Sequence, residues 1–511
     1  MSDPIRVLRD QLAVISDLRA AAAVLHWDQE TQMPPGGAAG RAMALATLTR
    51  LAHESFTSSG TGDLLAAAER AAGPLDPESD DAALVRVTRR DYDRLTKLPP
   101  DFVAERAREA SLSTEVWKEA RKQNDFAAFR PSLQKMVDFA RRTADYLGYA
   151  EHPYDALLDL YEPDMKAREV DTVFARLREV TVPFVRALGA RGRPIDDAVL
   201  HEEYPEAQQE AFGLTVAQAF GYDLGRGRLN VSAHPFATGF STGDVRITTR
   251  YNRRDLSEAV FGIFHEAGHA MYEQGVAPEL NRTPLARGVS LGLHESQSRM
   301  WENLVGRSRR FWEHYLPVLR QYFPDQLRGV EAEEFYRAVN RVTPSLIRTS
   351  ADEVTYNLHI MLRFDLEKAL LEGQVKVDDL PAAWVAKMDE YVGVTPATDA
   401  DGVMQDIHWS GGALGYFPTY ALGNIISVQL FEAARRAAPG IDDDIANGQF
   451  ATLLGWLRQR VHRHGRKFLP REILQRATGE TLTAEPYLRY LQRKFGDIYG
   501  VSIAGAPAAA E

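Results

Sequence analysis

LSEAVFGIFHEAGHAMYEQG (Leu256–Gly275) is the stretch of sequence that decides the fold and places the chemistry. Its apolar residues recur at helical spacing, and a polar residue that can cap a helix lies at its start. His265 and His269 are four residues apart, so both imidazoles lie on one face of the helix and can reach one ion. Glu266 falls on the flank of that face, within reach of a water beside the ion. The H-E-x-x-H spacing therefore predicts a zinc-type peptidase helix with Glu266 as the general base.

A catalytic zinc site needs a third protein ligand and one position left open for water. No third histidine follows at a suitable spacing, but the helical stretch LGLHESQSRMWENLVG lies downstream. It offers Glu295 and Glu302, which are seven residues apart and therefore share a face of that helix. The residues alone leave both carboxylates as candidates. A structural pair of histidines is the alternative explanation of the motif, and the helical context and the downstream carboxylates favour the metal site.

The clearest strand signal lies just before the metal helix. LNVSAHPF (residues 229–236) and DVRITTRY (residues 244–251) flank the glycine-containing segment ATGFSTG. This pattern predicts a hairpin whose two strands are joined by ATGFSTG as a loop. Helical periodicity dominates the rest of the chain. The expected fold class is mainly α, a single large helical fold with a small β-sheet beside the zinc helix.

Composition and charge exclude several classes of protein. The chain of 511 residues is 26% charged and carries a formal net charge of −11, which argues against a nucleic-acid binder or a protein held on an anionic membrane. It has no cysteine, so a metal must be held by His, Asp or Glu. Charged residues interrupt the N-terminal segment too often for a secretory signal, and we expect a cytoplasmic location.

One uncharged stretch, residues 409–431, is long enough to span a bilayer. It contains several glycines, a proline and polar residues, with a turn signal near its middle. We therefore expect two buried segments joined by a loop, and no membrane span.

Several short motifs follow one another along the chain: LHWDQETQMPPGG (residues 25–37), HPF (234–236), DVRITTR (244–250), HESQS (294–298), IRTSAD (347–352), GVMQDIHW (402–409) and GYFPTY (415–420). With the HEAGH helix, this ordered set resembles the Taq-type (thermostable carboxypeptidase 1) metallocarboxypeptidases, relatives of the gluzincin peptidases. The resemblance covers nearly the whole chain. It implies Glu295 as the third metal ligand, with Glu302 as a supporting or structural residue. It also implies a helical fold with a deep active-site groove, a homodimer, and zinc or cobalt as the metal.

The resemblance implies a carboxypeptidase that releases single C-terminal residues from peptides, with broad specificity. Arg348, in IRTSAD, is then the expected partner of the free α-carboxylate, because a guanidinium offers a permanently charged bidentate donor. The structural alternative is a salt bridge from Arg348 to a neighbour such as Asp352 or Glu353.

Four further residues of the motifs are candidates for the substrate site. Tyr420 is the expected donor to the oxyanion that forms during hydrolysis. Tyr416, His234 and His408 are expected to help bind the substrate backbone. Core packing is the alternative role for each of the aromatic residues.

We expect residues 1–503 to form one catalytic domain, with the zinc helix near residues 256–274 and a disordered tail over residues 504–511. Two other functions remain as alternatives: an endo-oligopeptidase or aminopeptidase that uses the same zinc site, and a non-catalytic metal-binding protein of the same fold. The set Glu266, Glu295 and Arg348 argues against the second, because a binding protein has no need of a general base beside a metal.

Overall fold

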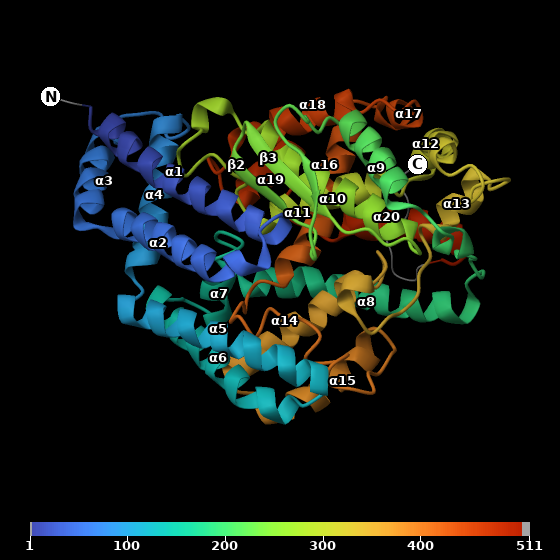
Figure 1. The fold of residues 1–511 in the computed structure, drawn as a ribbon, viewed down its shortest axis with the longest axis horizontal. Helices are drawn as coiled ribbons and strands as arrows, with labels where there is room; N and C mark the ends of the chain where they lie inside the picture. The colour runs from blue at the N-terminus through green and yellow to red at the C-terminus, as the bar shows by residue number, and fades with distance from the viewer. Residues whose placement is uncertain (1–2, 503–511) are drawn as a thin grey trace. The chain divides into compact units, whose positions relative to one another are not determined.

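The computed structural model of the protein describes residues 3–502, and helices form most of it (Figure 1). The chain folds into two compact units that alternate along the sequence. Unit 1 contains the described residues up to Thr96 together with Asp196–Val339 and Leu430–Thr481. Unit 2 contains Lys97–Ile195, Asn340–Gln429 and the described residues from Leu482 onward. The single domain over residues 1–503 stays a prediction, and the predicted tail over residues 504–511 lies outside the described residues.

Unit 1 contains the metal helix and most of the short helices of the structure. Its α-helices are α1 (Pro4–Thr31), α2 (Ala38–Thr57), α3 (Ser59–Ala72), α4 (Asp80–Thr96), α9 (Glu206–Phe220), α10 (Leu256–Gly275), α11 (Leu291–Arg299), α12 (Arg309–Tyr322), α13 (Ala332–Ala338), α17 (Ile441–Ala446), α18 (Ala451–Arg460) and α19 (Pro470–Thr478). Its shorter helical segments are η1 (Pro35–Gly37), η2 (Ala198–His201), η3 (Pro278–Leu280), η4 (Met300–Val305) and η7 (His462–His464).

The small sheet lies in unit 1, where Figure 1 shows it alongside α10. Its strand order is β1–β3–β2: β1 (Leu229–Val231) runs parallel to β3 (Asp244–Thr249), and β2 (Ala237–Ser241) runs antiparallel to β3. The predicted hairpin is wrong in its pairing, because the segment expected to be a loop contains β2. The true turn is the short link between Ser241 and Asp244. Gly239 does not break β2, since backbone pairing with β3 holds this strand and a glycine is tolerated there.

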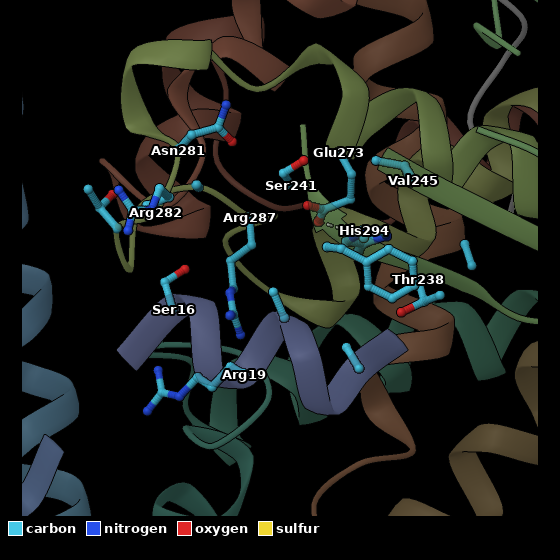
Figure 2. A pocket seen from close by; sticks show the side chains of 17 residues that line it. Ser16, Arg19, Thr238, Ser241, Val245, Glu273, Asn281, Arg282, Arg287 and His294 are labelled. Carbon is cyan, nitrogen blue, oxygen red and sulfur yellow. Dashed lines mark hydrogen bonds and ion pairs between the residues drawn. The ribbon is translucent and has the colours of Figure 1, made fainter. Parts of the chain in front are cut away.

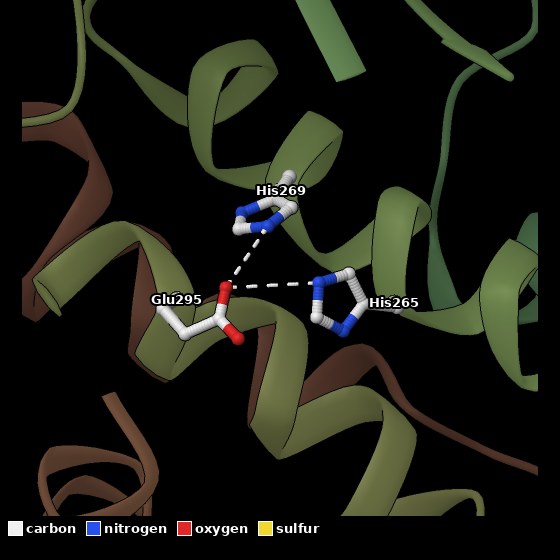
Figure 3. A group of neighbouring side chains, drawn as sticks. All are labelled: His265, His269 and Glu295. Atoms are coloured by element: carbon white, nitrogen blue, oxygen red, sulfur yellow. Dashed lines mark ion pairs between the residues drawn. The ribbon is translucent and has the colours of Figure 1, made fainter. Parts of the chain in front are cut away.

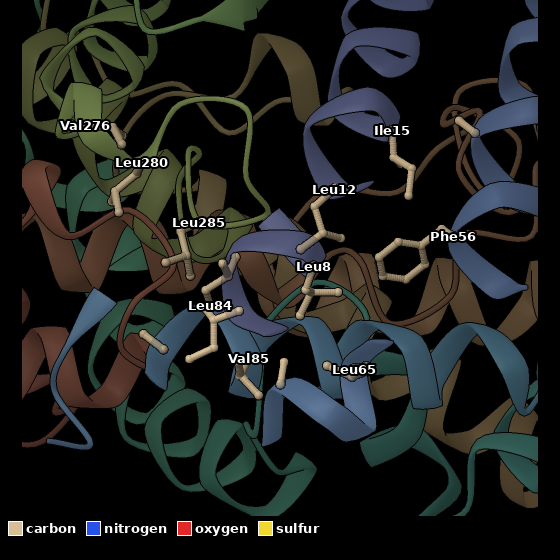
Figure 4. Close-up of a cluster of buried hydrophobic side chains, with 14 residues drawn as sticks. Leu8, Leu12, Ile15, Phe56, Leu65, Leu84, Val85, Val276, Leu280 and Leu285 are labelled. Carbon is tan, nitrogen blue, oxygen red and sulfur yellow. The ribbon is translucent and has the colours of Figure 1, made fainter. Parts of the chain in front are cut away.

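An apolar core holds the first four helices of unit 1 together (Figure 4). On α1, Leu8, Leu12 and Ile15 recur at helical spacing, and each is at most 2% exposed. They pack with residues of α2, α3 and α4 and with the segment that follows α10. The main partners are Phe56, Leu65, Leu84, Val276, Leu280 and Leu285. This packing fixes α1 beside the segment that connects α10 to α11.

Unit 2 is built from long helices around α14, whose residues are buried along almost its whole length. Its helices are α5 (Pro100–Gln123), α6 (Phe126–Leu147), α7 (Pro153–Leu158), α8 (Ala167–Arg191), η5 (Arg348–Ser350), α14 (Tyr356–Glu372), η6 (Val377–Asp379), α15 (Leu380–Tyr391) and α20 (Glu485–Tyr499). The uncharged stretch at residues 409–431 forms turns and then enters α16 (Pro418–Ala437), which continues from unit 2 into unit 1. Among residues 3–502, no helix combines the length and the apolar character that a bilayer span requires.

Candidate metal centre and arginine cluster

The metal helix α10 begins where the carboxylate of Asp255 accepts a hydrogen bond from the backbone N–H of Ser257. The helix packs against β3, and most of its residues are buried. His265 and His269 lie one turn apart with ring centroids 4.9 Å from each other. Glu266 is only 6% exposed. The structure thus confirms the predicted helix, and it places His265, Glu266 and His269 together on α10 in unit 1.

Gly268 lets α11 approach α10 closely. A Cβ at Gly268 would lie 2.7 Å from both the carbonyl oxygen of Gln297 and the Cα of Ser298. Such distances are far below van der Waals contact, so this position requires glycine. We did not predict this role from the sequence, although a glycine in the middle of a buried helix is the signal that could have revealed it.

Because of this close approach, Glu295 lies opposite the two histidines (Figure 3). Its Oε2 is 3.6 Å from His265 Nε2 and 3.4 Å from His269 Nε2. One potential ligand atom from each of the three residues lies within 4.8 Å of the others. Two imidazole nitrogens and one carboxylate oxygen form a ligand set that zinc accepts, with a further position left for water.

Three electrostatic features test whether these residues fit a cation. The carboxylates of Glu295 and Glu302 raise the pKa of His265 against the effect of burial, whereas burial lowers the pKa of His269 to about 4 and keeps that ring neutral with a lone pair to offer. Burial raises the pKa of Glu266 to about 7. The buried Oε2 of Glu266 has no hydrogen-bond partner among the described residues. Converging lone pairs beside an unsatisfied carboxylate oxygen fit a divalent cation with an adjacent water.

Glu302 contacts the other nitrogen of His265. Its Oε2 lies 2.8 Å from His265 Nδ1, and the other nitrogen of that ring, Nε2, faces Glu295. Glu302 sits in η4, a π-helical segment that follows α11 directly. Arg299 donates to Glu295 Oε1 at 2.7 Å and to Glu302 Oε2 at 3.2 Å, and so ties the two carboxylates together. The two glutamates both point toward His265, as their shared helix face predicted. Glu295 lies near Nε2 of the ring, and Glu302 contacts Nδ1.

A second pair of residues orients His269. Nδ1 of His269 lies 2.6 Å from Nδ1 of His294, and Nε2 of His294 lies 2.9 Å from Glu273 Oε1. Glu273 also accepts the backbone N–H of Gly288, and the hydrogen bond from His294 lowers its pKa against burial, so it is a pure acceptor. His294 must then donate from Nε2 and accept from His269, which leaves the lone pair of His269 Nε2 free. The sequence prediction missed His294 and Glu273, although His294 belongs to the HESQS motif.

Unit 2 holds Arg348 in a buried arginine cluster. Arg348 Nε and Nη2 donate to Asp406 Oδ1 at 3.0 and 2.7 Å, and Nη1 donates to Tyr356 Oη at 3.1 Å. Arg363 Nε donates to the other oxygen, Oδ2, of the same carboxylate at 2.7 Å. Arg348 therefore forms a salt bridge, but with Asp406 of the GVMQDIHW motif. Neither neighbour named from the sequence, Asp352 or Glu353, is its partner.

The remaining predicted residues fall into two groups. His408, Tyr416 and Tyr420 gather in unit 2, where His408 Nε2 lies 3.3 Å from Tyr420 Oη and the guanidinium of Arg348 lies 5.0 Å from the Tyr420 ring centroid. Burial lowers the pKa of His408 to about 4, so its ring is neutral. His234 belongs to unit 1, and its side chain is exposed after β1.

Glu367 is a buried residue that the sequence did not single out. Its two oxygens accept from Trp409 Nε1 at 2.7 Å, from Tyr154 Oη at 2.7 Å and from the backbone N–H of Gly415 at 3.0 Å. It therefore anchors both the GVMQDIHW and the GYFPTY motif to α14.

Comparisons with known proteins agree with this arrangement. The pattern of the carboxypeptidase Taq (M32) metallopeptidase family matches residues 7–495. Thermostable carboxypeptidase 1 of Thermus thermophilus is 44% identical over 96% of this chain and 97% of its own length. The crystal structure of the M32 carboxypeptidase from Deinococcus radiodurans R1 superposes with a TM-score of 0.95 at 44% identity, over 98% of this chain and 100% of that chain. Metallocarboxypeptidase 1 of Trypanosoma cruzi, at 34% identity, has a TM-score of 0.92 over 96% of this chain and 99% of that chain. The chain therefore belongs to the carboxypeptidase Taq (M32) metallopeptidase family and is a hydrolase of the metallocarboxypeptidase class.

Proposed function

We propose that this metallocarboxypeptidase releases single residues from the C-terminus of peptides of varied sequence, and that it uses zinc, or cobalt in its place. The observation that carries the proposal is the convergence of ligand atoms from His265, His269 and Glu295 within 4.8 Å, beside the unsatisfied buried carboxylate of Glu266. Two of these residues come from one helix and the third from another, so the site depends on the packing of α10 on α11.

A metal held by these three residues supplies a Lewis acid that polarises the scissile carbonyl and makes a neighbouring water more acidic. Glu266 accepts a proton from the attacking water and delivers it to the amine that leaves. Glu302 and His294 hold the two imidazoles by their Nδ1 atoms, so that both Nε2 lone pairs face the same point. Tyr420 donates to the developing oxyanion, and Tyr416, His408 and His234 contact the substrate backbone.

Glu266 is expected to act on the water without holding the metal. Glu266→Gln keeps the size of the side chain and removes the base, so bound metal and the melting temperature should stay at wild-type values. Turnover should fall by at least about 100-fold, the low end for loss of a general base. Metal analysis, thermal unfolding and a peptide digest measure the three quantities. Near-normal turnover in Glu266→Gln would remove Glu266 from the mechanism.

The charges around Arg348 support its role in binding the terminal carboxylate. Arg348 and Arg363 share the single carboxylate of Asp406. Burial lowers the pKa of His359 to about 3, so this neighbouring ring carries no charge. A guanidinium has five N–H groups, and Arg348 uses three of them within the described residues. The cluster therefore keeps a buried positive charge and unused donors, which a carboxylate can satisfy in the fork geometry that lysine lacks.

The test is a double-mutant cycle in which Arg348 is one partner and the C-terminal carboxylate of the substrate is the other. Arg348→Ala should lose about 30- to 800-fold of kcat/KM on a peptide with a free C-terminus, the worth of a charge-assisted bidentate pair in a partly dry site. Arg348→Lys should recover only part of that loss. The amidated form of the same peptide should be a poor substrate for the wild type, and its rate should barely change in Arg348→Ala.

Two other outcomes would change the assignment. If both peptides lose the same factor, Arg348 is only a structural partner of Asp406. If the wild type cuts amidated peptides internally at full rate, the enzyme is an endo-oligopeptidase.

We further propose a homodimer, which the family resemblance implies, and, independently of the resemblance, a location in the cytoplasm. Sedimentation at several protein concentrations tests the assembly, and cell fractionation tests the location. A monomer at all concentrations would contradict the first proposal.

A further inference from the structure

A cavity of about 470 Å³ lies in unit 1 next to the residues that orient the metal centre. Figure 2 shows its walls: α1 on one side, β2 and the segment around residues 281–287 on others, with Glu273 and His294 between them. His294 is also the partner of His269. One wall of the cavity is therefore formed by a residue that directly contacts a proposed metal ligand. The cavity itself has no role in the proposed hydrolysis.

Two arginines line this cavity, and neither is hydrogen-bonded to a carboxylate within residues 3–502. Arg19 comes from α1 and Arg287 from the segment before α11. In the part of the chain that the structure describes, neither guanidinium makes a hydrogen bond or an ion pair, and Arg19 only lies over the ring of Phe56, 5.1 Å from its centroid. Partial burial and the charge of Arg287 lower the pKa of Arg19. The two positive charges repel each other, and although Asp91 attracts both of them and Glu273 attracts Arg287, no carboxylate is hydrogen-bonded to either guanidinium among the described residues.

A third arginine at the cavity provides the contrast. Arg282 donates from Nε to Asp17 Oδ1 at 2.9 Å, so its charge is matched. The one acidic group of the cavity wall, Glu273, is engaged by His294 and by the N–H of Gly288. A ligand that enters the cavity thus meets two guanidiniums whose N–H groups are not used by the described residues, and these favour a negatively charged group.

The opposite wall indicates what carries that group. β2 is an edge strand, because β3 pairs with only one of its sides and the cavity is lined by Ala237–Ser241. The free side of an edge strand offers backbone donors and acceptors to an extended chain. A peptide along this strand can place a side chain between the arginines.

We propose that this cavity is a subsite for an acidic side chain, aspartate or glutamate, of the substrate peptide, bound by Arg19 and Arg287. The inference rests on the proposed peptidase function, because it takes the peptide as the ligand. The α-carboxylate of the released residue is assigned to Arg348, and we therefore place the acidic residue of the proposal on the N-terminal side of the bond that is cut. The subsite would make the enzyme favour peptides with an acidic residue at one upstream position.

The experiment uses matched peptides that differ only in Glu or Gln at successive positions upstream of the released residue. In the wild type, one position should give a Glu/Gln ratio of kcat/KM of about 5 to 30, as expected for a charged hydrogen bond that is partly open to solvent. The double variant Arg19→Ala/Arg287→Ala should bring that ratio to about one. Arg287→Glu should make Lys preferred over Glu at the same position. The matched control is Arg282→Ala, which removes an arginine already paired with Asp17 and should leave both rates and their ratio unchanged.

A free anion separates the substrate subsite from a site for a small ion. Sulfate should inhibit hydrolysis of the Glu peptide competitively and leave hydrolysis of the Gln peptide unaffected. The inference is overturned if no position shows a Glu/Gln preference, if the preference survives in the double variant, or if sulfate alters both peptides equally in the wild type and neither in the double variant. Cleavage of the Gln peptide by the wild type reports the carboxypeptidase activity separately, so a failed subsite and a failed function give different results.

Discussion

The candidate metal centre of unit 1 and the arginine cluster of unit 2 are both built from buried charged residues, but they offer opposite groups to a ligand: the first offers acceptor atoms and the second offers N–H donors. At the metal centre, Glu302 and His294 occupy the Nδ1 atoms of two histidines, and lone pairs are left to converge. At the arginine cluster, Asp406 occupies part of two guanidiniums, and N–H groups are left over. The first arrangement fits a cation and the second fits an anion.

This difference determines what each site costs the fold. The proposed metal ligands lie on two helices packed against each other, so we expect the loss of one ligand to reduce metal binding more than stability. The arginine cluster has no such independence, because its two buried guanidiniums depend on one carboxylate. An unpaired buried charge is among the costliest defects that a fold can carry.

Asp406→Asn should give the largest effect on stability. It leaves Arg348 and Arg363 buried without a negative partner, and the free energy of unfolding should fall by about 3–5 kcal/mol. Denaturant unfolding measures the loss. The control is Asp17→Ala, which removes the exposed partner of Arg282 and should cost less than about 1 kcal/mol. Equal losses in the two variants would mean that the cluster is not the buried charge system described here.

Gly268→Ala should break the metal centre through packing alone. Its Cβ would collide with the backbone of α11, which cannot move aside as a flexible side chain can, so we expect a loss of about 3 kcal/mol together with weaker metal binding. Gly262→Ala on the same helix is the matched control, because its Cβ meets only Thr249 Oγ1 at 3.5 Å. That variant should be neutral or gain up to about 1 kcal/mol from the better helix propensity of alanine. Unchanged metal content in Gly268→Ala would argue against this packing requirement.

The smallest effects should come from the residues that hold the histidines. Glu302→Ala and His294→Ala should keep the metal but weaken its binding about 10- to 100-fold, because each leaves one imidazole free to rotate. Glu295→Ala, which removes a ligand, should not retain stoichiometric metal. Competition with a chelator measures the affinities. If Glu302→Ala loses the metal and Glu295→Ala retains it, the two glutamates exchange roles.

Local patterns in the sequence predicted the elements whose signals lie within one turn or one helix. The helix α10 and the helical character of the chain followed from periodicity, capping and the H-E-x-x-H spacing. The strand pairing did not, because ATGFSTG has the composition of a loop and becomes a strand only where β3 pairs with it. The backbone groups of β2 form their hydrogen bonds with β3, and the residues of β2 themselves do not indicate that this partner is present.

The sequence by itself determined the mainly helical fold, the two histidines with Glu266, and a pair of candidate carboxylates, because each depends on residues a few positions apart on one helix. Only the tertiary structure decided that Glu295 faces both Nε2 atoms while Glu302 contacts Nδ1 of His265. Likewise, it decided that Arg348 pairs with Asp406, fifty-eight residues away. Contacts between distant segments depend on how helices pack, and packing is set by the shape of whole surfaces, such as the space that Gly268 leaves open.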